Sequence, residues 1–121
     1  MKILKEKDVP KREDKGELRH YYLFNDYEII VTKVPRGHMQ LWHSHKLIRE
    51  THYLMKGQIE ILEEKKTVIM KPGDLVLISP GRAHTLRNRG KSTAYVLTLK
   101  TIPNPKPHPR SIFSEDKEIK T

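Results

Sequence analysis

The chain has 121 residues, a length that suits one compact domain and is too short for two. It contains no cysteine, which excludes disulfides and thiolate ligands, so any bound metal must be held by nitrogen and oxygen atoms. The formal net charge of +9 suggests nucleic-acid binding, but acidic and basic side chains are mixed along the chain, which favours a solvated surface instead.

No segment of the sequence predicts a membrane span or a secretory signal. The apolar runs are all shorter than the ~20 residues that cross a bilayer, and charged residues interrupt the first eight positions. We therefore expect a cytoplasmic protein without a membrane partner.

The body of the chain, from about residue 18 to residue 101, is typical of short β-strands separated by turns. β-Branched and aromatic residues are frequent, and glycine and proline recur between the runs, as at Pro72-Gly73 and Pro80-Gly81. There is no convincing apolar pattern with the 3.6-residue period of a helix, so the sequence predicts an all-β sandwich or barrel. The predicted strands are 19–24, 27–35, 39–45, 50–56, 58–64, 67–71, 74–79, 83–88 and 93–101.

The C-terminal tail, residues 102–121, differs from the body. Proline stands at every second position from Pro103 to Pro109, and because proline cannot donate to a hydrogen-bond ladder, this spacing excludes a central strand. We expect an extended segment across the surface of the body, with Ile112 and Phe113 as apolar anchors and residues 114 to 121 loose.

Three histidines and one glutamate form the most informative pattern. His43 and His45 lie two apart in a predicted strand, so both side chains point to one face. Glu50 begins the next strand after a short loop, which places its carboxylate opposite the histidines, and His84 joins them from a third strand. Such a set suits one divalent transition-metal ion (Fe, Mn, Zn, Ni, Co or Cu). We call these four residues the candidate ligands.

Each candidate ligand also has an ordinary explanation when taken alone. A glutamate after a loop is usually a solvated strand end, and a histidine after a Pro-Gly turn is usually a hydrogen-bonded turn residue. A single His-x-His pair is weak evidence for a metal. The joint arrangement, with glycines placed around it, favours the metal site.

The arrangement of these residues resembles the two sequence motifs of the cupin superfamily. The first motif is matched without a gap by Gly37, His43, His45, Glu50 and Gly57. The second is matched in spacing by Gly73, Ser79-Pro80-Gly81, His84 and Asn88, with Ser79 where the family usually has proline. The resemblance covers about residues 19 to 101 and implies a jelly-roll barrel, the double-stranded β-helix, with the candidate ligands on the metal.

This resemblance also organises the rest of the chain. We expect a single barrel domain at 1–101, with its motif core at 37–88, followed by the tail at 102–121. Gly57 is expected at the turn from one strand into the next. Asn88 is expected to fix the end of the His84 strand through side-chain bonds to the backbone.

Three further residues bear on the site. Strand alternation places His52 on the face of Glu50, which makes it a candidate catalytic residue that moves a proton, although a bond to a wall carbonyl would explain it equally well. Arg82 begins a basic stretch that could meet an anionic ligand, although surface solvation is its commoner role. His38 has the opposite parity to His43 and is expected to face outward.

Two classes of function follow. The first is a small mononuclear metal enzyme that acts on a small molecule, and the basic stretch favours an anionic one. For this class the resemblance implies a dioxygenase, a sugar or sugar-phosphate isomerase, or a decarboxylase. The second is a non-catalytic module that binds a metal or a small ligand. A homodimer is expected in both cases, because small barrels leave sheet edges and faces exposed. Nucleic-acid binding rests on charge alone and is not favoured.

Overall fold

The computed structural model describes residues 1–103, 113 and 116–119, and these residues form β-strands, turns and a short 3-10 helix, η1 (Glu6–Asp8). The first strands are β1 (Lys11–Asp14), β2 (Glu17–Leu23), β3 (Tyr27–Val34), β4 (His43–His45) and β5 (Arg49–Lys56). They are followed by β6 (Ile59–Glu63), β7 (Lys66–Met70), β8 (Leu75–Ile78), β9 (His84–Arg87), β10 (Ala94–Thr101) and β11 (Lys117–Ile119). No helix of the described residues is long and apolar enough to cross a membrane.

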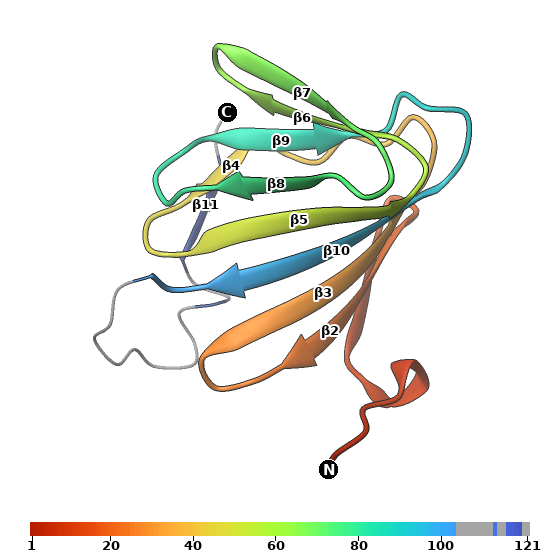
Figure 1. The fold of residues 1–121 in the computed structure, drawn as a ribbon, viewed down its shortest axis with the longest axis vertical. Helices are drawn as coiled ribbons and strands as arrows, with labels where there is room; N and C mark the ends of the chain where they lie inside the picture. The colour runs from red at the N-terminus through yellow and green to blue at the C-terminus, as the bar shows by residue number, and fades with distance from the viewer. Residues whose placement is uncertain (104–112, 114–115, 120–121) are drawn as a thin grey trace.

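The strands form two antiparallel sheets that face each other (Figure 1). One sheet has the order β1-β2-β3-β10-β5-β8, and the other has the order β11-β4-β9-β6-β7. From β3 onward the chain passes repeatedly from one sheet to the other, which is the connectivity of a jelly roll. The predicted all-β double-stranded β-helix is therefore confirmed.

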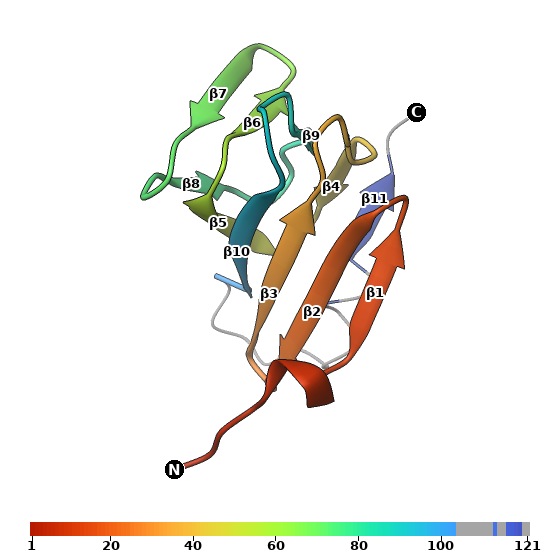
Figure 2. The same cartoon turned by 90° about the vertical axis from the view of Figure 1, so that its right-hand side faces the viewer.

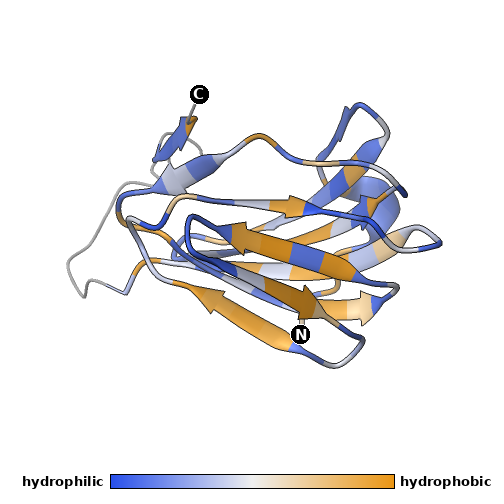
Figure 3. Ribbon diagram, turned by 90° about the horizontal axis from the view of Figure 1, so that it is seen from above, coloured by the Kyte–Doolittle hydropathy of each residue, from blue (hydrophilic) through white to orange (hydrophobic). Residues whose placement is uncertain are grey.

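Alternation along the strands builds the interior. In β3 every second residue from Glu28 to Val34 is buried, and in β10 every second residue from Ala94 to Thr98 is buried. The same alternation of apolar and polar residues is visible along several strands in Figure 3. The buried core consists of Val34, Leu54, Ile59, Ile61, Met70, Ile78, Leu86, Ala94 and Val96.

Two turn residues expected from the sequence do what was predicted of them. Gly57 joins β5 to β6 with a φ of +88°, and a Cβ atom there would lie 2.9 Å from the Cα atom of Ala94, so only glycine fits. The Asn88 amide donates hydrogen bonds to the carbonyls of Val34 and Ser92, each over 2.9 Å, and its oxygen accepts one from the Gly90 N–H. Asn88 thus fixes the end of β9.

The structure corrects the predicted strands at three places. The predicted strand 39–45 is shorter, because only His43–His45 pair regularly and Met39 forms an isolated bridge. β1 was not predicted, because its four residues are charged and exposed, yet it pairs with β2 across a turn in which Lys15 and Gly16 both have positive φ. The tail was expected to be loose after residue 113, but 117–119 form β11.

The described part of the tail is tied to the barrel. β11 pairs with β4, so that Lys117 lies opposite His45 and Ile119 opposite His43. The Asp116 carboxylate accepts hydrogen bonds from the N–H groups of Leu47 and Ile48, over 2.9 and 3.1 Å. Phe113 is 3% exposed, as expected of an anchor, whereas Ile112 lies outside the described residues. Figure 2 shows β11 at the edge of the molecule.

Candidate metal centre

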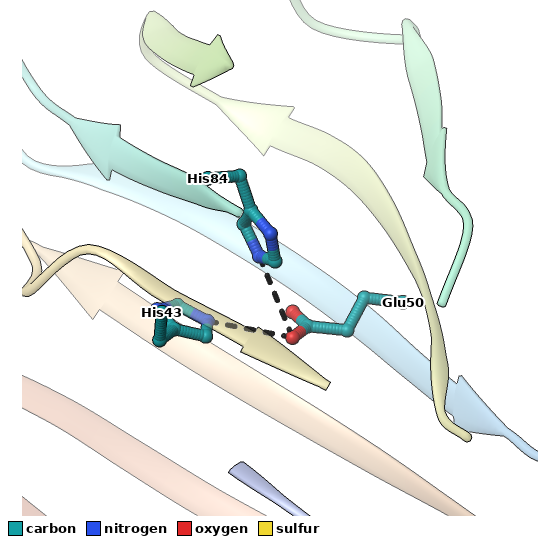
Figure 4. Close-up of side chains that lie close together, drawn as sticks. All are labelled: His43, Glu50 and His84. Carbon is teal, nitrogen blue, oxygen red and sulfur yellow. Dashed lines mark ion pairs between the residues drawn. The ribbon is translucent and has the colours of Figure 1, made fainter. Parts of the chain in front are cut away.

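The four candidate ligands converge inside the barrel. β4 supplies His43 and His45, β5 supplies Glu50, and β9 supplies His84 directly opposite His43 in the sheet register. Each of the four is at most 5% exposed. Figure 4 shows the imidazoles of His43 and His84 directed toward the Glu50 carboxylate.

One oxygen of Glu50 is the meeting point. Its Oε1 atom lies 3.5 Å from the Nε2 atoms of His43 and His84, and 2.5 Å from the Nε2 atom of His45. Ligand atoms of His43, Glu50 and His84 all lie within 4.8 Å of one another, a spacing at which they could hold one metal ion. His45 adjoins this set through its close approach to Glu50.

The hydrogen bonds of the histidines suit metal binding. The Nδ1 atom of His43 lies 2.9 Å from the Leu41 carbonyl, and that of His84 lies 2.9 Å from the Arg82 carbonyl. Since a carbonyl only accepts, each Nδ1 carries the proton and each Nε2 presents a lone pair to the centre. Buried atoms without a hydrogen-bond partner among the described residues include Nε2 of His45, Nε2 of His84 and Oε1 of Glu50.

Such unpartnered buried polar atoms are costly unless something binds them. A transition-metal ion would accept the lone pairs of the imidazoles and of the carboxylate together, so the donor set fits the metal that the sequence predicts.

Burial and charge oppose each other at this centre. Burial favours the neutral acid of Glu50, but its contacts with the surrounding histidines hold the pKa of that carboxyl well below its usual range. Burial lowers the pKa of His43. Burial acts in the same direction on His84, yet there the Glu50 carboxylate outweighs it and raises the pKa. A negative charge is therefore kept in the middle of the cluster.

His52 occupies the other side of the same carboxylate. Its Nε2 atom lies 3.1 Å from Oε2 of Glu50, and its Nδ1 atom lies 2.8 Å from the hydroxyl of Thr98. The side chain is 6% exposed. His52 therefore lies next to the candidate ligands, at the Glu50 oxygen that the other histidines do not contact. Its hydrogen bond is with the Thr98 hydroxyl and not with a backbone carbonyl of the wall.

A cavity of about 50 Å³ adjoins the centre, and we call it the metal cavity. His43, His45, Glu50 and His52 line it, together with apolar and hydroxyl side chains of β3, β9 and β10. Three cations, Arg19 from β2, Lys100 from β10 and Lys117 from β11, also line it. Among the described residues around the cavity, Glu50 is the only carboxylate. We call the three cations the cation cluster.

Sequence reasoning missed the cation cluster and chose other cations instead. Arg82 is exposed and lines a different hollow together with Glu63 and Glu64. Arg87 and Arg89 of the same basic stretch are paired with Glu60. Of the two roles that the sequence left open for Arg82, the structure agrees with surface solvation, and what Arg82 contributes to the centre is its backbone carbonyl.

A buried carboxylate holds part of the cation cluster in place. Glu17, 1% exposed, accepts hydrogen bonds from Arg19 over 2.8 Å and from Gln40 over 2.5 Å, and it also contacts His38 over 3.1 Å. His38 therefore turns toward this network and does not face outward as expected. Alternation of Glu17, Arg19 and Tyr21 along β2 is the sequence signal that could have revealed an inward-facing polar row.

Comparisons with known proteins agree with this architecture. The chain resembles a predicted oxalate decarboxylase of Thermotoga maritima, at a TM-score of 0.75 and 18% identity over 84% of this chain and 99% of that one. It also resembles a sugar phosphate isomerase from a cupin superfamily, from Silicibacter pomeroyi, at a TM-score of 0.73 and 17% identity over 83% and 75% of the two chains. A polyketide cyclase from Streptomyces resistomycificus matches at a TM-score of 0.70 and 19% identity over 88% and 82%.

These identities are low enough that the three likenesses show the fold alone. No curated protein matches the sequence. The family model described as the cupin domain matches residues 30–100, which is more than half of the chain and includes every candidate ligand. The protein therefore belongs to the cupin family.

Proposed function

We propose that this protein is a mononuclear metal-dependent enzyme that acts on a small anionic molecule, with His43, His45, Glu50 and His84 as the metal ligands. The observation that carries this proposal is the metal cavity, which reaches three of the four candidate ligands. A purely structural ion would be enclosed by protein, whereas a cavity beside the ligands leaves room for water or substrate. A bound ion would supply Lewis acidity or oxygen activation there.

The residues around the ion would supply orientation and proton transfer. His52 bonds to Thr98 through Nδ1 and contacts Glu50 through Nε2, so its ring is fixed against the carboxylate while its edge lines the metal cavity. An imidazole so placed can move a proton to or from a bound substrate, and we assign this catalytic role to His52. The apolar wall formed by Ile30, Leu86 and Val96 would limit the access of water.

Oxidoreductases of the dioxygenase type and sugar or sugar-phosphate isomerases are the reaction classes that we favour. The similar structures named above include a predicted oxalate decarboxylase and a sugar phosphate isomerase, whose names both imply anionic substrates. The three cations around the metal cavity support an anionic substrate for this protein as well. The alternative is a non-catalytic cupin module in which the same centre binds a metal or a small ligand.

Elemental analysis of the gel-filtered protein tests the metal centre. We expect about one Fe, Mn, Co, Ni, Cu or Zn per chain. His45→Ala and His84→Ala should each lose at least about 100-fold in metal affinity, since even partners of ligands are worth 10–100-fold. Glu64→Gln, an exposed change remote from these residues in sequence, serves as the control. Full occupancy in both histidine variants would contradict the ligand assignment.

Water exchange separates the enzyme from the structural-metal alternative. In protein loaded with Mn²⁺, a metal position open to solvent should enhance the relaxation of bulk water protons, and a fully ligated ion should not. A strong enhancement that small carboxylates or phosphate reduce would support an open catalytic site. Absence of enhancement with full metal occupancy would favour the non-catalytic module.

A cytoplasmic homodimer completes the proposal. The outer face of the six-stranded sheet carries a row of apolar side chains in register, with Val31, Leu97, Tyr53 and Leu75 on neighbouring strands. Tyr53 is 41% and Leu75 59% exposed in the single chain, and a second copy could cover them. Light scattering should give twice the chain mass of 14.3 kDa, and a mass equal to one chain would refute the dimer.

A further inference from the structure

The cation cluster lies in register with the residues of the metal centre. In the sheets, Lys117 of β11 is opposite His45, and Lys100 of β10 is opposite Glu50. Arg19 of β2 is opposite Thr32, which also lines the metal cavity. The six-stranded sheet therefore brings two positive charges to this space, and the five-stranded sheet brings one through its C-terminal strand, β11. The three cations belong to separate strands, so pairing between distant strands brings them together and no local sequence pattern does.

These like charges act on one another. Partial burial lowers the pKa of Lys117, and repulsion from Arg19 and Lys100 lowers it further. Attraction to Glu50 and Glu17 acts in the opposite direction but does not cancel this shift. The one carboxylate that lines the metal cavity, Glu50, is already surrounded by histidines. Glu17 offsets the charge of Arg19 through their ion pair, so the excess positive charge lies on the two lysines, and a metal ion would increase it. Repulsion of this kind is relieved when an anion binds between the cations.

Size limits what that anion can be. A single water molecule needs about 10–15 Å³ of cavity volume, so a cavity of about 50 Å³ holds only a few non-hydrogen atoms. A carboxylate or a phosphate group is of this size, whereas a whole sugar is not. Arg19, Gln40 and Lys117 also line a wider outer hollow of about 490 Å³, so the remainder of a larger ligand could extend past them.

We propose that Arg19, Lys100 and Lys117 form an oxyanion subsite, which holds a carboxylate or phosphate group of the substrate beside the metal centre. The inference rests on the proposed function, because the subsite adjoins the proposed metal ligands. Lys117 gives the C-terminal strand a role in the site, and Arg19 is held in position by the buried Glu17. Arg19 and the lysines are binding residues, while Glu17 is a positioning residue.

Titration calorimetry on the metal-loaded full-length protein tests the subsite, with oxalate and inorganic phosphate as the two probes. Lys100→Met and Lys117→Met remove a charge but keep most of the aliphatic stem. We expect each to weaken binding of the preferred probe about tenfold, which is the effect of one lost charged contact. Arg82→Met, a matched loss of charge at an exposed position outside the lining of the metal cavity, should change binding less than twofold. The stronger probe identifies the anion as a carboxylate or a phosphate.

Metal content, measured on the same samples, keeps the two proposals apart. One outcome is that the wild type takes up no metal but still binds a probe, and that this binding is lost in the Lys100 and Lys117 variants. This would support the subsite and count against the metal enzyme. Full metal content with unchanged probe binding in both lysine variants would overturn the subsite and leave the metal centre intact. An equal loss in Arg82→Met, or no binding of either probe to the wild type, would also overturn it.

Discussion

The same strands build two unlike ends of the barrel interior. On β5, Glu50 and His52 face inward at one end and Leu54 at the other, and on β10, Ala94 and Val96 give way to Thr98 and Lys100. The apolar end contains the buried core. The polar end contains the candidate ligands, the metal cavity and the cation cluster.

The comparison separates what stabilises the fold from what the fold is used for. At the apolar end, close packing of aliphatic side chains supplies the free energy of folding. At the polar end, several buried polar atoms lack hydrogen-bond partners among the described residues, which costs free energy in the absence of a ligand. Substitutions at the two ends should therefore separate stability from binding.

The largest expected effect on stability is at the apolar end. Leu54→Ala should lower the free energy of unfolding by about 3 kcal/mol, because Leu54 is 0% exposed and its loss leaves a cavity in the core. Urea denaturation measures this change. Metal bound per folded chain should stay at the wild-type value, since Leu54 lies outside the lining of the metal cavity. Loss of metal from the folded variant would show that the two ends are coupled.

A smaller effect is expected at the polar end when pH is lowered. In metal-free protein, the pKa of Glu50 lies well below its usual range in the folded state, so its contribution to stability is present above the unfolded value of about 4.5. That contribution is lost as pH falls from there through the folded pKa. The urea midpoint of the wild type should therefore drop more steeply below about pH 4.5 than that of Glu50→Gln.

Glu64→Gln is the matched control for this measurement, because Glu64 is exposed. Its pH dependence should follow the wild type. If the urea midpoints of the wild type and Glu50→Gln changed equally with pH, the histidines would not stabilise the Glu50 carboxylate. The polar end would then make no pH-dependent contribution to stability through Glu50.

The two ends also differ in how far the sequence reveals them. The candidate ligands could be predicted because His43, His45 and Glu50 stand at a short, fixed spacing around one hairpin, and strand parity then indicates their common face. His84 was added from a third strand after the Pro80-Gly81 turn, and the family resemblance implies the same four ligands. In the structure these four residues lie together, although the metal itself stays a proposal.

The cation cluster could not be predicted in the same way. Arg19, Lys100 and Lys117 come from strands far apart in the sequence, and each taken alone has the appearance of an ordinary surface cation. β11 was missed because a short edge strand of charged residues has no apolar signature, yet it pairs with β4 through its backbone. Long-range sheet pairing, which a single sequence does not show, places these charges.

The boundary between the ends gives the smallest expected effect. Thr98 follows Val96 on the inner face of β10, and its hydroxyl is 2.8 Å from Nδ1 of His52. Thr98→Val keeps the side-chain shape but extends the apolar end by one residue. Stability should change by about 1 kcal/mol or less, the net contribution of one hydrogen bond. Metal affinity should change by less than tenfold, because Thr98 contacts His52 and not a candidate ligand.

The informative readout for Thr98→Val is the orientation of the His52 ring, followed by the line shapes of its ring signals in NMR spectra. Without the hydroxyl, Nδ1 loses its hydrogen-bond partner at position 98, and the Glu50 contact on Nε2 remains to hold the ring. We expect the ring signals to broaden or split, as for an imidazole that samples two orientations. Signals identical to those of the wild type would show that Glu50 alone positions His52, and the polar end would then begin at His52 rather than at Thr98.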